Sequence, residues 1–114
     1  MMLNGGTLGE VRLLSPATVQ AMTTNQLAGM PRVPEEERRC RPWGLGWRHP
    51  WPAHSANFGD LLRPRTYGHW GAMCTLYWLD PEREAFCILF TTQPQGDEGR
   101  FLARISNVVA AALT

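Results

Sequence analysis

The 114-residue sequence contains no lysine, because all 11 of its basic side chains are arginines. This excludes from the chain a lysine base, a Schiff-base lysine and the lysine of a phosphate-binding loop. With 10 acidic residues the formal net charge is only +1, so no long-range field favours a nucleic acid or an anionic membrane surface. We therefore expect neither nucleic acid nor membrane as a partner.

Cysteine is also scarce. Cys40, Cys74 and Cys87 are odd in number and have no CxxC spacing, which predicts neither a disulfide framework nor a zinc site. His49 and His54 have no carboxylate or thiol partner at ligand spacing. The sequence thus predicts no metal and no cofactor.

Long apolar runs are missing as well. No stretch approaches the roughly 20 apolar residues that a membrane-spanning helix needs. The opening segment MMLNGGTLGEV lacks the charged region and apolar core of a signal peptide. Together with the free cysteines, these features predict a soluble protein, cytoplasmic by default. A hydrophobic fraction of 44% is typical of a globular chain, and residues 1–114 are expected to form a single unit with a modest core.

The strongest structural signal lies in residues 67–92. This stretch reads as one long β-hairpin, with strands at 67–79 and 85–92 that reverse at Asp80-Pro81-Glu82-Arg83. Both faces of both strands are largely apolar, which indicates a sheet with layers packed on either side.

Helices are expected before and after this hairpin. Ser15 followed by Pro16 predicts the start of a short helix that ends near residues 23–25, with Val19 and Met22 on its apolar edge. A terminal helix, with Asp97 as candidate cap, is predicted from its apolar repeat; that repeat comprises Phe101, Leu102, Ile105, Val108, Val109, Ala112 and Leu113. Arg100 and Arg104 fall toward the solvent side of this helix.

The remaining segments read as shorter or irregular pieces. Residues 1–3 resemble the last turn of a helix stopped by glycines, and residues 28–42 a charged surface loop. Residues 43–48 are a strand candidate whose glycines allow close approach of another backbone, and 49–65 an irregular excursion.

The fold class predicted is α+β: a small antiparallel sheet with a long central hairpin, packed by a C-terminal amphipathic helix. One good covering helix and one short helix are too few for two apolar sheet faces. This shortage suggests that the chain is part of a larger fold.

Five ordered pieces of the sequence resemble the serine β-lactamase-like family, which includes class C β-lactamases and penicillin-binding-protein-type esterases and amide hydrolases. They are residues 3–6 (LNGG), 12–19 (RLLSPATV), 44–47 (GLGW), 67–72 (YGHWGA) and 80–82 (DPE). The resemblance implies a partial β-lactamase-like fold, of which this chain would be the C-terminal part.

The resemblance also implies a site at the start of the hairpin. His69-Trp70-Gly71 matches the His-x-Gly form of the family's third motif. By that match His69 would line the pocket and take part in proton traffic, and Gly71 would let substrate approach the strand. The backbone N–H of Ala72 would be one half of an oxyanion hole. The substrate class implied is a small-molecule ester or amide, hydrolysed through a serine acyl-enzyme.

The chain departs from the family pattern in ways that bear on activity. It lacks the Ser-x-x-Lys motif, since it has no lysine, and it lacks the Tyr-x-Asn or Tyr-x-Ser motif. Many members have a Gly-Thr pair where this chain has Cys74-Thr75. As a nucleophile of its own, Cys74 would sit in an apolar strand that makes a thiol inert, so a structural role is favoured. Whether the isolated chain is an enzyme therefore stays open.

Two alternatives to a catalytic segment remain. The first is a non-catalytic truncated or split module, which would form a homo-oligomer or dock onto a complementing N-terminal segment that carries the missing motifs. The second is an unrelated α+β binding domain that uses a tryptophan-rich patch, formed by Trp43, Trp47, Trp51, Trp70 and Trp78.

Overall fold

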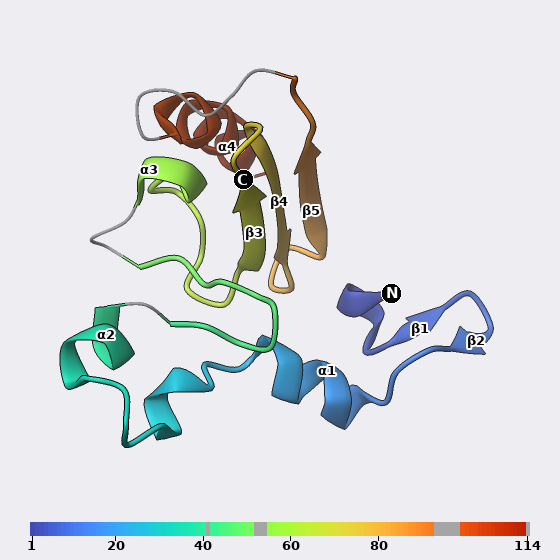
Figure 1. Ribbon diagram of the computed structural model, residues 1–114. Coiled ribbons are helices and arrows are strands. Elements are labelled where there is room, and N and C mark those ends of the chain that lie inside the picture. Colours follow the sequence, from blue (N-terminus) through green and yellow to red (C-terminus); the bar gives the residue numbers. More distant parts are fainter. Residues whose placement is uncertain (41, 52–54, 93–98, 114) are drawn as a thin grey trace.

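The computed structural model of the chain describes residues 1–40, 42–51, 55–92 and 99–113 (Figure 1). The fold is α+β, as predicted, with a three-stranded antiparallel sheet and a separate two-stranded hairpin. Its elements in chain order are η1 (Met2–Asn4), β1 (Thr7–Leu8), β2 (Val11–Arg12), α1 (Pro16–Thr23), η2 (Leu27–Gly29), α2 (Glu35–Cys40), α3 (Ser55–Phe58), β3 (Tyr67–Gly71), β4 (Thr75–Asp80), β5 (Ala85–Leu89) and α4 (Arg100–Ala112).

The main sheet has the order β3-β4-β5, so β4 is its central strand. A single strand over 67–79 was expected, and this prediction is wrong: the segment forms β3 and β4, joined by a turn at residues 72–74. The Cys74 N–H donates to the Gly71 carbonyl at 3.0 Å, and Cys74 has a left-handed φ of 59°. Alternation of side chains cannot reveal this turn, because apolar residues continue through it.

The second reversal lies where the sequence predicts it, between β4 and β5. The Asp80 carboxylate is fully buried and accepts the N–H groups of Glu82 and Arg83 at 3.0 and 3.2 Å. Its other oxygen accepts Arg83 Nη1 at 3.2 Å. This side chain therefore replaces the backbone partners that the turn leaves unsatisfied.

One face of the sheet packs against α3 and α4 (Figure 1). Trp78 and Leu76 of β4 are fully buried there, together with Phe58 of α3 and Leu102 of α4. The Trp78 indole Nε1 donates to the Ser106 hydroxyl of α4 at 3.0 Å. The predicted terminal helix and its packing on the sheet are confirmed.

The predicted apolar stripe of α4 is partly wrong. Phe101 is 54% exposed and Val108 is 71% exposed, whereas Ser106 is buried. The stripe is narrower than the sequence indicates, because Leu102, Ser106 and Ala110 are the buried residues of α4 and Val109 packs beside them. Gly99 occupies the N-cap position, and Asp97 lies outside the described residues.

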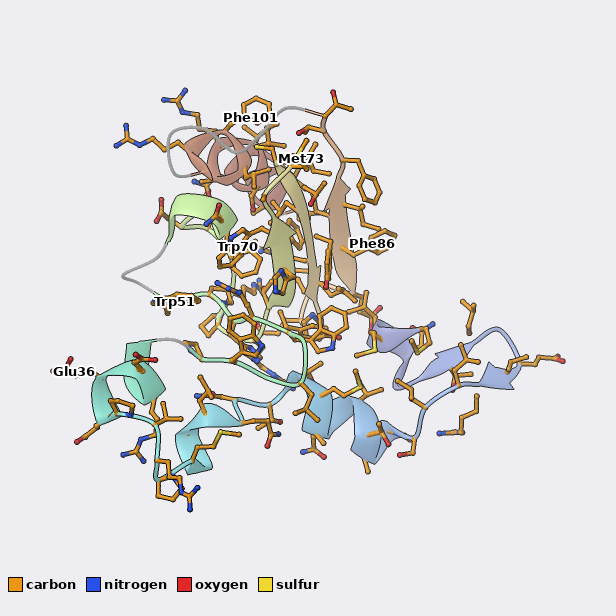
Figure 2. The ribbon with its side chains drawn as sticks, in the orientation of Figure 1. Glu36, Trp51, Trp70, Met73, Phe86 and Phe101 are labelled. Atoms are coloured by element: carbon orange, nitrogen blue, oxygen red, sulfur yellow. The ribbon has the colours of Figure 1, made fainter. Side chains whose placement is uncertain are left out.

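The opposite face is covered at one end only. Met2 of η1, Val19 of α1 and Tyr67 of β3 form a second small core there. Farther along β5, Phe86 and Ile88 are 64% and 56% exposed, and Figure 2 shows Phe86 directed away from the sheet. The predicted shortage of covering layers is therefore a property of this face.

The N-terminal elements agree with the capping predictions. Ser15 Oγ accepts the Thr18 N–H at 3.1 Å and Pro16 opens α1, so the predicted helix start is confirmed. η1 ends at Gly5, whose φ of 59° is left-handed, as expected of a glycine that stops a helical turn. The β1–β2 hairpin was not predicted, since each of its strands has only two residues.

Two predictions for the middle of the chain are wrong. The charged segment 28–42 was expected to be a loop but contains α2, whose first turn holds three glutamates that favour the positive end of a helix. Residues 43–48 form a tight reversal with an isolated bridge from Trp43 to Arg48, not a strand. The close approach expected of its glycines does occur, since a Cβ on Gly44 would clash with the Met22 carbonyl oxygen.

Candidate functional site

The candidate site lies at the end of β3, an edge strand of the main sheet. At the start of this edge, Gly68 pairs with Arg48 through two backbone hydrogen bonds of 2.8 and 2.9 Å. In a strand, alternate residues direct their N–H groups to the same side. The N–H group of Trp70 therefore points away from the sheet, as that of Gly68 does. Ala72, just after the strand, is the next residue in this alternation.

His69 precedes Trp70 in β3, and its side chain lies on the less covered face of the sheet. Its register partner on β4 is Tyr77. The imidazole is half-buried, and its Nδ1 lies 2.7 Å from the Trp70 carbonyl oxygen. A carbonyl only accepts, so Nδ1 carries the proton, and in the neutral ring Nε2 keeps its lone pair. The ring is thus oriented by the backbone of its own motif.

Gly71 ends the strand at a crowded point. A Cβ at this position would lie 2.6 Å from the Thr75 hydroxyl oxygen on β4. A side chain here would have to displace the Thr75 hydroxyl. The absence of a side chain at Gly71 therefore leaves room for the Thr75 hydroxyl, apart from any close approach by a ligand.

Ala72 begins the turn and is exposed, as is Met73 after it. Within the described residues, no backbone hydrogen bond of the turn uses the Ala72 N–H. An exposed N–H at a strand edge can donate to an oxyanion without prior rearrangement. The structure thus places all three predicted site residues, His69, Gly71 and Ala72, within residues 69–72 at the end of β3.

Cys74 closes this turn and is buried in the core. Its left-handed φ of 59° is a conformation that glycine adopts freely and other residues rarely do. By the resemblance to the serine β-lactamase-like family, this is a position at which many members have glycine. The thiol packs as a core side chain, which agrees with the structural role favoured from sequence.

An arginine that the sequence did not single out lies beside the motif. The Arg48 guanidinium carbon is 4.0 Å from the ring centroids of both Trp43 and Trp70. Trp43 also contacts the His69 ring edge to face, with centroids 5.7 Å apart. The stack joins the 43–48 reversal to β3, and only the tertiary structure reveals it because its members are far apart in sequence.

The tryptophan-rich patch expected from sequence is not one surface. Trp78 is fully buried in the core, so it cannot contribute to binding. Trp47 packs edge to face on Tyr67 and Tyr77, at 5.1 and 5.6 Å. Trp51 lies 6.5 Å from Trp70, and Figure 2 shows the two on the same side of the sheet edge.

No group of three or more potential metal ligands occurs within the described part of the chain. His49 is half-buried, and burial lowers the pKa of its imidazole below the usual 6.5, while a backbone hydrogen bond with Thr66 acts in the opposite direction. His54 lies outside the described residues. In residues 1–40, 42–51, 55–92 and 99–113, no helix is both long and apolar enough to cross a membrane.

Several known proteins are similar in sequence to this chain. Proteins provisionally named D-alanyl-D-alanine carboxypeptidases are 34% identical over 94 residues in Escherichia coli O157:H7 and 33% identical over 94 residues in Escherichia coli K12. A protein with the same provisional name in Salmonella paratyphi B is 36% identical over 95 residues. Each match covers 82% of this chain.

A solved structure agrees with these relatives. The crystal structure of a β-lactamase from Mycobacterium bovis superposes with a TM-score of 0.69 at 28% sequence identity. The match covers 90% of this chain and 39% of that one. No family model matches the sequence.

The coverage of the relatives is uneven. This chain spans only 19% of the length of the carboxypeptidase-named proteins, although most of its own length is matched. The sequence similarity and the shared fold agree on one assignment. The chain belongs to the serine β-lactamase-like family and matches only part of the longer members.

Proposed function

We propose that this chain is the C-terminal part of a serine hydrolase domain and supplies one wall of its active site. The reaction would be hydrolysis of a small-molecule ester or amide through a serine acyl-enzyme. The serine and the lysine base would come from sequence outside these 114 residues, because the chain has no lysine. The family membership and the carboxypeptidase and β-lactamase names of the relatives support this reaction class.

The observation that carries the proposal is the position of Ala72. Its N–H follows the outward-facing edge of β3 and has no backbone partner in the described turn. An oxyanion that develops when the serine attacks the substrate carbonyl could accept a hydrogen bond there. Removal of one such donor typically lowers the rate by about 100- to 1,000-fold.

His69 and Gly71 would act around this donor. With Nδ1 held by the Trp70 carbonyl, His69 Nε2 is the nitrogen that can exchange a proton or a hydrogen bond with the substrate. Gly71 pairs with Thr75 of β4 beside the donor and presents no side chain. The three residues would thus position the substrate and stabilise the oxyanion, but none of them is the nucleophile.

The test joins this chain to the part that it lacks. The 94 matched residues of the Escherichia coli K12 relative would be replaced by this chain, and the chimera compared with the isolated chain. We expect hydrolysis of p-nitrophenyl acetate or nitrocefin only by the chimera, with labelling of its serine by a fluorophosphonate.

Two variants of the chimera probe the donor. Ala72→Pro removes the N–H and is expected to lower kcat about 100-fold. Ala72→Ser keeps the N–H and serves as the control with near-unchanged rate. Equal rates for the two variants, or hydrolysis by the isolated chain, would show that this assignment is wrong.

A non-catalytic docking module is the second candidate. The observation in its favour is the absence of the nucleophile and lysine motifs from the chain. In that case the chimera would fold without forming an acyl-enzyme.

A further inference from the structure

The turn that carries Ala72 has a conformation that its residues do not favour by themselves. Residues 72–74 connect β3 to β4, and Cys74 at the end of the turn is buried in the core. A three-residue connection whose last residue is left-handed is a common form of β-hairpin, and that residue is usually glycine. Because Cys74 takes this position with a φ of 59°, other contacts must maintain the conformation.

Thr91 supplies such contacts from beyond the end of β5. Leu76 pairs with Leu89, and the same register continued by two residues places Thr91 opposite Cys74. Figure 1 shows the β3–β4 turn and the end of β5 at the same end of the sheet. Thr91 Oγ1 lies 3.1 Å from the Met73 carbonyl oxygen and 3.0 Å from that of Cys74. The hydroxyl has one proton, which it donates to the two carbonyls in turn or together.

These hydrogen bonds reach Ala72 through two peptide planes. The Met73 carbonyl and the Cys74 N–H belong to one planar group. Thr91 holds its carbonyl, and its N–H donates to the Gly71 carbonyl at 3.0 Å. The Gly71 carbonyl shares the other plane with the Ala72 N–H. In a trans peptide the two point in opposite directions, so a Gly71 carbonyl held toward Cys74 directs the Ala72 N–H out of the turn.

We propose that Thr91 is a positioning residue for the hydrolase site, because its hydroxyl fixes the turn that directs the Ala72 N–H toward the oxyanion. This inference rests on the proposed function, which gives that N–H its role. Thr91 acts only through the turn, since its proton is used by the carbonyls of Met73 and Cys74.

The first test examines the turn in the 114-residue chain. Thr91→Val keeps the shape of the side chain and removes the hydroxyl, whereas Thr91→Ser keeps the hydroxyl. Thr92→Val is the matched control, because it makes the same change at the neighbouring, exposed threonine. Exchange of amide hydrogens, followed by NMR, reports on the bond from the Cys74 N–H to the Gly71 carbonyl.

We expect the Cys74 amide to exchange about tenfold faster in Thr91→Val than in the unchanged chain, because the turn opens more often. Thr91→Ser and Thr92→Val should leave its exchange nearly unchanged. The Trp78 amide, in the middle of β4, should exchange alike in all four proteins, which would show that the sheet is intact. A Cys74 amide that exchanges alike in Thr91→Val and Thr92→Val would overturn the proposal.

The second test measures the consequence for the reaction in the chimera with the Escherichia coli K12 relative. Thr91→Val should lower kcat about tenfold and leave KM nearly unchanged, because the oxyanion forms only as the reaction proceeds. Thr91→Ser should restore most of this loss, and Thr92→Val should cause none. A higher KM with unchanged kcat, or a loss that Thr91→Ser does not restore, would contradict a positioning role.

Failure of the proposed function would be seen separately. A chimera with the unchanged chain that hydrolyses nothing would reject that function, and with it the catalytic consequence for Thr91. Amide exchange in the isolated chain would still confirm or exclude that Thr91 holds the turn.

Discussion

The two faces of the main sheet are alike in sequence and different in structure. Toward α3 and α4, Trp78 and Leu76 are fully buried. On the other face, Phe86 and Ile88, from a strand of similar hydrophobicity, are more than half exposed. The hydrophobic pattern indicates which face of a strand should be buried. Only the neighbouring helices and strands determine whether that face is buried.

The difference also separates stability from function. The covered face contains the larger core and a buried hydrogen bond from sheet to helix, between Trp78 and Ser106. The less covered face carries His69 and an apolar groove between η1 and the strands β4 and β5. Substitutions on the first should change the folding of this chain, whereas substitutions of exposed residues on the second should change it little.

The largest expected effect on stability comes from substitutions that compare the two faces of the main sheet. Trp78→Ala removes a fully buried indole and should lower the free energy of unfolding by about 3–5 kcal/mol. Phe86→Ala, the control on the exposed face, should change it by less than about 0.5 kcal/mol. Urea unfolding followed by circular dichroism measures both; similar losses for the two variants would contradict the comparison.

A smaller effect is expected from the hydrogen bond between sheet and helix. Ser106→Ala leaves the buried Trp78 Nε1 without its acceptor and should cost about 1–3 kcal/mol. In a Trp78→Phe background the same substitution should cost clearly less, since the donor is absent. Additive losses in the double-mutant cycle would show that the bond contributes nothing.

The smallest effect concerns pH and lies outside both faces. Burial lowers the pKa of His49 in the folded chain below the 6.5 of the unfolded one, so the folded state binds fewer protons. The stability that this histidine contributes is therefore present above pH 6.5 and is lost as the pH falls toward its folded pKa.

His49→Gln should flatten the decrease of the urea midpoint between pH 7.5 and pH 5. The other histidines remain in both proteins, so the difference between the curves reports on position 49 alone. Parallel curves would mean that His49 titrates alike in the folded and unfolded states.

Local rules accounted for much of the fold. The cap at Ser15, the turn at Asp80 and the periodicity of α4 could be read from short segments, because each depends on residues within one turn or two. The division of residues 67–79 could not, since apolar residues run through the turn and Cys74 adopts a conformation that its residue type does not favour.

The candidate site could be predicted from short segments of the sequence only in part. His69, Gly71 and Ala72 lie within the four-residue segment 69–72, so a motif could identify them together. Arg48 is 22 residues before Trp70, and its stacking follows from the path of the intervening chain. The order of the strands, which makes β3 an edge and so leaves Ala72 accessible, is likewise a property of the whole sheet.

The sequence by itself determined the α+β class, the cap at Ser15, the family resemblance and the lack of a lysine. These depend on residue identity and on spacing over a few positions. Only the tertiary structure decided that β3 lies at an edge, that Trp78 is core while Phe86 is exposed, and that His69 shares a face with the groove. The physical reason is that burial and accessibility are relations between distant segments, and a side chain has neither until the layers around it are in place.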